Sequence, residues 1–267
     1  VLHGNSWTKY AFTMDLAANV PTTKDAKFRI TADETGKYWF SRITLFPETF
    51  NHRKNGLRKD LMTMMKNMNP KFLSFPGGNY VEGNDFQNRF DWKRTIGNPD
   101  ERPGHRSPWG YKSTDGLGLP EFLQWAEDVG AEPLVAVFAG YTLNGDHLTA
   151  DYIGPFVQDA LDEIEYITGG PETKWGAQRV KDGHPTPFPL HYLEIGNEDF
   201  FDKSGSYPER YKKFYEAIKA KYPHLQLIST IDAQMMAEQA KETGVENIKP
   251  DVIDEHYYRN TESMYRA

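Results

Sequence analysis

The chain has 267 residues, of which 38% are hydrophobic, 26% are charged and 14% are aromatic. This composition is too apolar and too aromatic for a disordered chain, and the length suffices for one large globular domain or two ordinary ones. Lys and Arg number 31 against 38 Asp and Glu, which gives a net charge of −7. This balance disfavours binding to a nucleic acid backbone.

Cysteine is absent, which excludes disulfides, thiolate catalysis and Cys-ligated metal sites. No apolar run approaches the ~18 residues of a membrane span, so we expect a soluble protein without a membrane partner. The chain begins at Val1 without an initiator Met or a signal-peptide pattern, and we interpret its first residues as a processed or cut end. The sequence leaves the compartment open, and a secreted or periplasmic location is compatible with it.

Two short segments near the start of the chain, residues 7–16 and 37–46, are rich in aromatic residues and partly alternate between apolar and polar side chains. Pro, Thr and Asp residues separate them, so the pattern predicts β-strands of an antiparallel sheet. About three strands cannot cover both faces of a sheet by themselves. We therefore interpret residues 1–46 as part of a larger β-sandwich.

After Pro47 the sequence alternates between amphipathic segments and short apolar runs. Apolar residues at helical spacing, ended by Gly or Asn-Pro, predict helices. These helices are expected over residues 57–68, 119–129, 153–167 and 211–222. The apolar runs predict strands near residues 72–75, 134–138, 191–195, 225–230 and 252–258. Thr261 is expected to cap one further helix.

This alternation predicts a parallel sheet with right-handed crossovers, either a TIM-type (β/α)8 barrel or an open doubly wound sheet. We favour the barrel because no G-x-G-x-x-G motif or P-loop follows a strand, while several strands end in polar residues. Four steps between the strands take about 45 residues each, so eight would need about 360. Residues 47–267 are therefore expected to form an incomplete barrel.

The run Gly196-Asn197-Glu198 follows the strand expected at residues 191–195. A carboxylate at the carboxyl end of a parallel strand can act as a general acid or base, and a neighbouring Asn amide can bind a substrate hydroxyl. A Glu at a strand end is also often a solvated loop residue. The grouping with Gly and Asn makes Glu198 a catalytic candidate and Asn197 a binding candidate.

A second polar cluster, Asp254-Glu255-His256-Tyr257-Tyr258, ends the last expected strand. Strand alternation places Glu255 and Tyr257 on one face and His256 and Tyr258 on the other. The alternative is a structural cluster in which the aromatic residues close a loop region and His256 only makes hydrogen bonds. No H-E-x-x-H or comparable ligand spacing is present, so we expect no metal site.

Two loops before the second expected helix contain further binding candidates. Gly78 allows the backbone to approach a ligand closely, and Asn79 can exchange hydrogen bonds with hydroxyls, although paired glycines followed by Asn are also typical of a plain turn. The loop of residues 90–111 is aromatic and polar and contains Trp109. Such a loop can bind a sugar, or it can form a small cluster on the surface.

Four stretches of the sequence, in this order, together resemble glycoside hydrolase family 51, the retaining α-L-arabinofuranosidases. They are FLSFPGGNYVEG, RPGHRSPWGYKSTDGLGLPEFLQWAEDVGAEPLVAVFAG, KWGAQRVKDGHPTPFPLHYLEIGNED and DVIDEHYY. The resemblance extends from about Tyr38 to the last residue. It implies a (β/α)8 barrel beside β-sandwich material, with residues 1–46 belonging to a carbohydrate-binding-like sandwich inserted after the first barrel strand.

The resemblance also implies roles for individual residues. Glu198, at the end of the family's fourth barrel strand, would be the general acid/base, and Asn197 would meet the sugar 2-hydroxyl. Gly78 and Asn79 match a loop after the second strand that contacts the sugar. Trp109 matches the aromatic residue of the following loop.

The resemblance assigns the catalytic nucleophile to a Glu after the seventh strand, whereas strands two to six are expected here. Tyr257 matches a Tyr of the sixth strand that touches this nucleophile. Retaining hydrolysis requires two carboxyls ~5–5.5 Å apart. Glu255 is the one carboxylate of this sequence that could take the second position, but strand order and the family pattern place the nucleophile further on. We keep Glu255 as a substrate-binding candidate.

These features together predict a retaining glycoside hydrolase that releases L-arabinofuranose from arabinoxylan or arabinan. An endo-xylanase or endo-glucanase of the same superfamily is the first alternative, since it would share the chemistry and differ in loop shape. The second is a catalytically incomplete fragment that binds polysaccharide. In each case the expected partner is a polysaccharide or oligosaccharide and no cofactor is expected. The oligomeric state stays open.

Overall fold

The computed structural model describes residues 6–17 and 19–266. Residues 1–5, 18 and 267 lie outside the described part, and so does the processed or cut end that we expect at Val1. The chain divides into two compact units, residues 1–43 and residues 44–267. The assignment of residues 1–46 to a β-sandwich and of residues 47–267 to a barrel stays a prediction.

The first unit has no helix or strand within residues 6–17 and 19–43, so the strands expected at residues 7–16 and 37–46 are not formed there. The physical reason is that an amphipathic strand is stabilised by a partner strand and by burial of its apolar face. Neither is provided, because the aromatic side chains of these segments face solvent. Trp7 is 75% exposed and Trp39 is 73% exposed.

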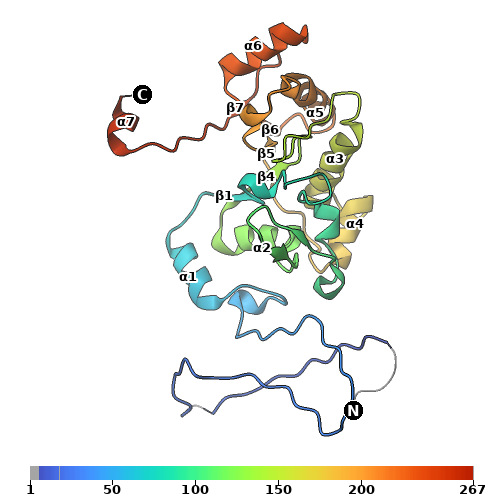
Figure 1. Cartoon of the computed structure of the whole chain (residues 1–267), viewed down its shortest axis with the longest axis vertical. Helices are drawn as coiled ribbons and strands as arrows, with labels where there is room; N and C mark the ends of the chain where they lie inside the picture. The colour runs from blue at the N-terminus through green and yellow to red at the C-terminus, as the bar shows by residue number, and fades with distance from the viewer. Residues whose placement is uncertain (1–5, 18, 267) are drawn as a thin grey trace. The chain divides into compact units, whose positions relative to one another are not determined.

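The second unit contains a five-stranded parallel sheet in the order β1-β4-β5-β6-β7 (Figure 1). Its strands are β1 (Phe72–Phe75), β4 (Glu132–Val137), β5 (Tyr192–Ile195), β6 (Gln226–Ser229) and β7 (Val252–Ile253). All four pairings are parallel. A separate antiparallel hairpin is formed by β2 (His105–Arg106) and β3 (Lys112–Ser113). The five strands expected from the sequence are all present, and the parallel sheet is confirmed.

Helices connect the strands, and Figure 1 shows α2 to α5 arranged around β1 to β6. They are α1 (Lys59–Asn67), α2 (Leu119–Val129), α3 (Gly154–Thr168), α4 (Lys174–Lys181), α5 (Tyr207–Lys221), α6 (Ala233–Thr243) and α7 (Thr261–Tyr265). The four helices expected from apolar spacing are confirmed, whereas α4 and α6 were not predicted. At α7 the predicted cap is wrong, because the capping side chain is that of Asn260, which accepts a hydrogen bond from Ser263 N.

The last strand is shorter than the expected 252–258, since β7 ends at Ile253. In the described part of the chain, β7 pairs with β6 on one side only. Tyr257 and Tyr258 beyond it are exposed, so little burial favours an extended ladder there. His256 instead turns toward the end of β5, as described below.

The core of the second unit lies between the sheet and the helices α2 to α6. Strand residues at its centre, such as Val135, Leu193 and Leu227, are fully buried and pack with helix residues such as Leu123 and Phe214. Apolar side chains on both faces of the inner strands are typical of a parallel sheet covered by helices. Because every strand points in the same direction, the carboxyl ends of all five meet at one edge of the sheet.

Two glycines near the hairpin β2–β3 differ in how closely the chain is packed around them. Gly97 and Gly104 have nearly the same positive φ, 72° and 71°. A Cβ at Gly104 would lie 2.3 Å from Ser113 O, whereas a Cβ at Gly97 would meet nothing within 4 Å. We expect Gly97→Ala to cost about 1 kcal/mol through backbone strain alone, and Gly104→Ala to cost about 2–3 kcal/mol more through overlap with the carbonyl.

Urea unfolding of the two variants, followed by circular dichroism, measures this difference. Equal losses of stability in both variants would contradict the close approach of Gly104 to the hairpin.

Candidate active site

The turn that follows β5 positions the main catalytic candidate. Gly196 has φ 95° and Glu198 has φ 49°, so the chain turns sharply into the short helix Asp199–Phe201. A Cβ at position 196 would lie 1.8 Å from Asp199 Oδ2, which means that only glycine fits. A non-glycine residue in the left-handed region is strained, and Glu198 is held there by its surroundings.

The carboxyl of Asp199 holds this turn in place through hydrogen bonds and an ion pair. Its Oδ2 accepts hydrogen bonds from Asn197 N at 3.1 Å and from Thr230 Oγ1 at 2.9 Å. Its Oδ1 lies 3.2 Å from Arg210 Nη2. Burial raises the pKa of Asp199 to about 6, an effect that the positive charge of Arg210 opposes.

The carboxyl of Glu198 contacts groups from two other strand ends. Its Oε1 lies 2.8 Å from His256 Nδ1, beyond β7, and its Oε2 accepts a weak hydrogen bond from Asn79 Nδ2, beyond β1, at 3.4 Å. The Glu198 side chain is 14% exposed, so it is reachable from solvent but largely enclosed. The structure therefore brings together Asn79 and Glu198, which the sequence analysis had named as separate candidates.

The ring of His256 lies between two carboxyl groups, those of Glu198 and Asp254. Its Nε2 lies 2.9 Å from Asp254 Oδ2, so each ring nitrogen faces a carboxyl oxygen. Two carboxylates can both accept from this ring only when both of its nitrogens carry protons. Burial opposes that charge, but the hydrogen bonds to Glu198 and Asp254 outweigh it and raise the pKa of His256. The two carboxyls therefore favour the protonated form of His256.

Two further buried carboxyls border the site. Glu194, within β5, is driven by burial and by the negative charge of Asp254 to a pKa of about 8. Glu82, after β1, is raised by burial to a pKa of about 8 as well, and its Oε1 accepts a hydrogen bond from Asn197 Nδ2 at 3.0 Å. Asn197 itself is buried. Both carboxyls are thus mainly neutral at pH 7.

Trp109 is connected to the Asn79 loop through a stacked tyrosine, Tyr80. Its ring stacks on Tyr80, with centroids 5.9 Å apart and planes at 8°, while the side chain stays 57% exposed. Tyr80 directly follows Asn79 in the chain. Gly78, beside them, has open space where a Cβ would be. The arrangement presents a flat aromatic face next to a polar strand end, which suits the ring of a sugar.

Glu255 and Tyr257 lie apart from these groups. The Tyr257 hydroxyl donates a short hydrogen bond to Glu255, and both side chains are exposed. Tyr257 is 52% exposed. The contact with Glu198 comes from His256, on the opposite face of the segment. Strand alternation had placed Glu255 and Tyr257 on one face of this segment and His256 on the other. It gave no reason to expect that the face with His256 would contact Glu198.

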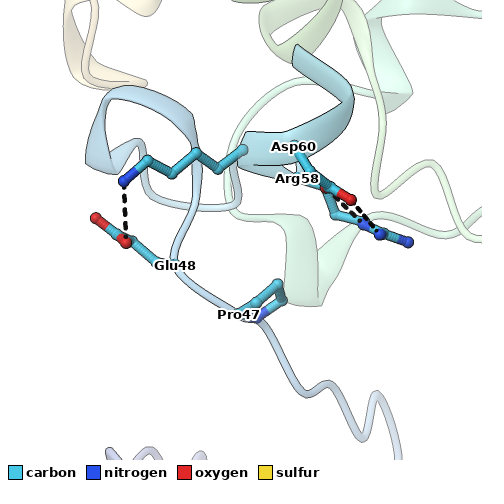
Figure 2. Close-up of a pocket in the computed structure, with 5 residues that line it drawn as sticks. Pro47, Glu48, Arg58 and Asp60 are labelled. Atoms are coloured by element: carbon cyan, nitrogen blue, oxygen red, sulfur yellow. Dashed lines mark hydrogen bonds and ion pairs between the residues drawn. The ribbon is translucent and has the colours of Figure 1, made fainter. Parts of the chain in front are cut away.

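A surface depression elsewhere in the second unit is lined by Pro47, Glu48, Arg58, Lys59 and Asp60 (Figure 2). Lys59 Nζ lies 3.2 Å from Glu48 Oε2, and Arg58 pairs with Asp60 at 2.6 Å. These charged groups satisfy one another at exposed positions, where such pairs contribute little. None of them lies at a strand end, so we place the candidate site at Glu198.

Within residues 6–17 and 19–266, no three His, Asp or Glu side chains are grouped so that they could hold a metal ion. In the same part of the chain, no helix combines the length and apolarity that crossing a bilayer requires.

A parallel sheet whose strand ends gather carboxyl, amide and aromatic groups is typical of an α/β enzyme domain. The family model of the α-L-arabinofuranosidase 1 domain matches residues 64–267. The chain therefore belongs to this family, and the resemblance to glycoside hydrolase family 51 is confirmed.

The chain is also similar to two individual α-L-arabinofuranosidases. α-L-Arabinofuranosidase A of Aspergillus niger is 44% identical over 208 residues, which are 76% of this chain and 33% of that protein. α-L-Arabinofuranosidase 2 of Arabidopsis thaliana is 41% identical over 229 residues, 85% of this chain and 33% of that protein. The chain thus spans about a third of the length of these relatives.

Solved structures are similar in fold. The arabinose-bound MgGH51 α-L-arabinofuranosidase has a TM-score of 0.75 and 41% identity, and the match covers 83% of this chain and 34% of that one. The arabinose complex of the Thermotoga maritima α-L-arabinofuranosidase has a TM-score of 0.59 and 25% identity, with coverage of 74% and 38%.

The neutral form of Glu194 makes stability depend on pH. Its pKa is about 8 in the folded chain against 4.5 for an ordinary Glu, so between these values the folded state retains a proton that the unfolded state loses. The unfolding free energy should therefore fall as pH rises from 4.5 to 8. Glu194→Gln should make this slope shallower by at most about 1.4 kcal/mol per pH unit.

Denaturant unfolding at several pH values measures the slope. Glu242→Gln, at an exposed position of α6, is the control and should leave the slope unchanged. An identical slope in wild type and Glu194→Gln would show that Glu194 is ionised in the folded chain.

Proposed function

We propose that this chain is the acid/base-bearing part of an α-L-arabinofuranosidase, a retaining glycoside hydrolase that releases L-arabinofuranose from arabinoxylan or arabinan. The observation that supports this most is the environment of Glu198. It is a largely enclosed carboxyl at a strand end, in contact with His256 and Asn79. Membership of the α-L-arabinofuranosidase 1 domain family supports the same activity.

In the proposed reaction, Glu198 first protonates the oxygen of the leaving group and later removes a proton from the attacking water. The hydrogen bonds to Glu198 and Asp254 favour the protonated form of His256. Asp254 stabilises the charged ring through its contact with Nε2. His256 Nδ1 is therefore placed to pass a proton to or from Glu198.

The substrate would lie over the strand ends. Asn79 and Asn197 provide amide groups for sugar hydroxyls, and Trp109 provides an aromatic face for the ring. Gly78 leaves room for the sugar to approach the backbone. Glu255 and Tyr257 are exposed, which favours contacts with outer parts of a polymer. The proposed reaction needs no metal or cofactor.

The fold proposed for the whole enzyme is a (β/α)8 barrel, of which the five parallel strands would be strands two to six. The parallel order and the similarity to family 51 structures support this. The nucleophile is then expected after a later strand, about 5–5.5 Å from Glu198. For residues 1–46 we keep the β-sandwich, because exposed aromatic side chains such as Trp7 and Trp39 would be buried by partner strands.

The activity is tested with Glu198→Ala in the full-length enzyme that carries this chain. Because only poor leaving groups need a proton from Glu198, we expect kcat/KM to fall about 10²–10⁴-fold for arabino-oligosaccharides and much less for an activated aryl arabinofuranoside. Hydrolysis rates on both substrates measure this difference.

Glu255→Gln serves as the comparison, since Glu255 also follows a strand of the sheet, β7, but makes no hydrogen bond to Glu198. It should retain most of its activity on both substrates. Loss of all activity in Glu255→Gln, with Glu198→Ala unaffected, would show that the roles have been assigned to the wrong carboxyl.

A further inference from the structure

A second carboxyl of the site is buried without a charged partner. Glu82 is only 2% exposed, and its Oε1 accepts a hydrogen bond from Asn197 Nδ2 at 3.0 Å. We propose that Glu82 is a positioning residue that holds the side-chain amide of Asn197 at the Glu198 site. Its effect on catalysis rests on the function proposed for Glu198.

The hydrogen bond between Asn197 and Glu82 is important because it joins loops that follow two different strands. Glu82 and Asn79 follow β1, whereas Asn197 and Glu198 follow β5, and β4 lies between these strands. The ladders of the sheet therefore do not join the two loops directly. Side-chain hydrogen bonds do so instead, from Asn197 to Glu82 and from Asn79 to Glu198. The first is shorter by 0.4 Å, because the two distances are 3.0 and 3.4 Å.

Glu82 also determines which way the Asn197 amide faces. Nδ2 of Asn197, and not Oδ1, is directed toward Glu82 Oε1 at 3.0 Å, so Oε1 is the acceptor and the proton of the neutral carboxyl belongs on Oε2. The main chain of Asn197 is fixed separately by its N–H, which donates to Asp199 Oδ2. With both ends held, Asn197 Oδ1 and the second hydrogen of Nδ2 have a defined direction beside Glu198.

The acceptor, and not the charge, is what this role requires. Burial keeps Glu82 mainly neutral at pH 7, and the carbonyl oxygen of a neutral carboxyl still accepts from Nδ2. Glu82→Gln preserves this acceptor, and Glu82→Met removes it at similar volume. Removal would leave Asn197 Nδ2 buried and without its partner, which is costly and frees the amide to reorient.

Kinetics of the full-length enzyme test the effect on catalysis. On an aryl α-L-arabinofuranoside, Glu82→Met should lower kcat/KM about tenfold, the scale of one lost hydrogen bond, and Glu82→Gln less than about threefold. In an Asn197→Ala background, Glu82→Met should cause no further loss, because it acts through Asn197.

Glu163 provides the matched control. It is 3% exposed, lies on α3, has a pKa raised by burial and, like Glu82, has one oxygen without a hydrogen bond among the described residues. Glu163→Met should affect thermal stability but leave kcat/KM within about twofold of wild type, as one expects for a purely structural substitution. Equal kinetic effects at the two positions, or additive losses in the Asn197→Ala background, would overturn the proposal.

Nuclear magnetic resonance tests the contact without relying on activity. In the 267-residue chain, the side-chain amide signals of Asn197 should shift as Glu82 titrates near pH 8, and Glu82→Gln should abolish this shift while Glu163→Gln preserves it. Signals that titrate equally in both variants would refute the positioning role. An inactive full-length enzyme with the expected signals would instead refute the proposed function and leave the contact in place.

Discussion

The site depends on the buried guanidinium of Arg210, on α5. Its Nε donates to Ala139 O at 2.7 Å, and its Nη groups contact Asp199 and Asp202. Arg210 thereby joins the loop after β4 to the turn after β5, and Asp199 extends the connection to Thr230 after β6. A fully buried Arg is favourable only when its donors are satisfied in this way, so these loops have to keep one arrangement. The strained turn that presents Glu198 is held by that arrangement.

Around this fixed turn, the site is assembled from carboxyls that lie at the ends of several strands or within β5. His256 approaches Glu198 from β7, and Glu82 holds Asn197 from the side of β1. Burial keeps Glu82 and Glu194 mainly neutral at pH 7. Several acidic side chains can therefore lie close together without strong mutual repulsion, which is a condition for general acid catalysis in a largely enclosed site.

Apolar spacing was sufficient to predict the five strands and four of the helices, because their buried faces carry apolar side chains at regular intervals. It missed α4, whose buried residues are Gly176 and Arg179, and α6, where only Met236 and Ala240 are buried. The contact between Asn79 and Glu198 was predictable because parallel strands end at one edge. The role of His256 was not, because alternation separates the faces of a segment without showing which face meets the end of β5, two strands away in the sheet.

The central claim is that Glu198 is the general acid/base, and azide rescue of Glu198→Ala tests it most directly. In a retaining enzyme, azide can enter the space left by the acid/base and attack the glycosyl-enzyme. The account predicts that azide accelerates turnover of an aryl α-L-arabinofuranoside and yields an arabinofuranosyl azide with the anomeric configuration of the substrate. An inverted azide product would identify Glu198 as the nucleophile and contradict the account.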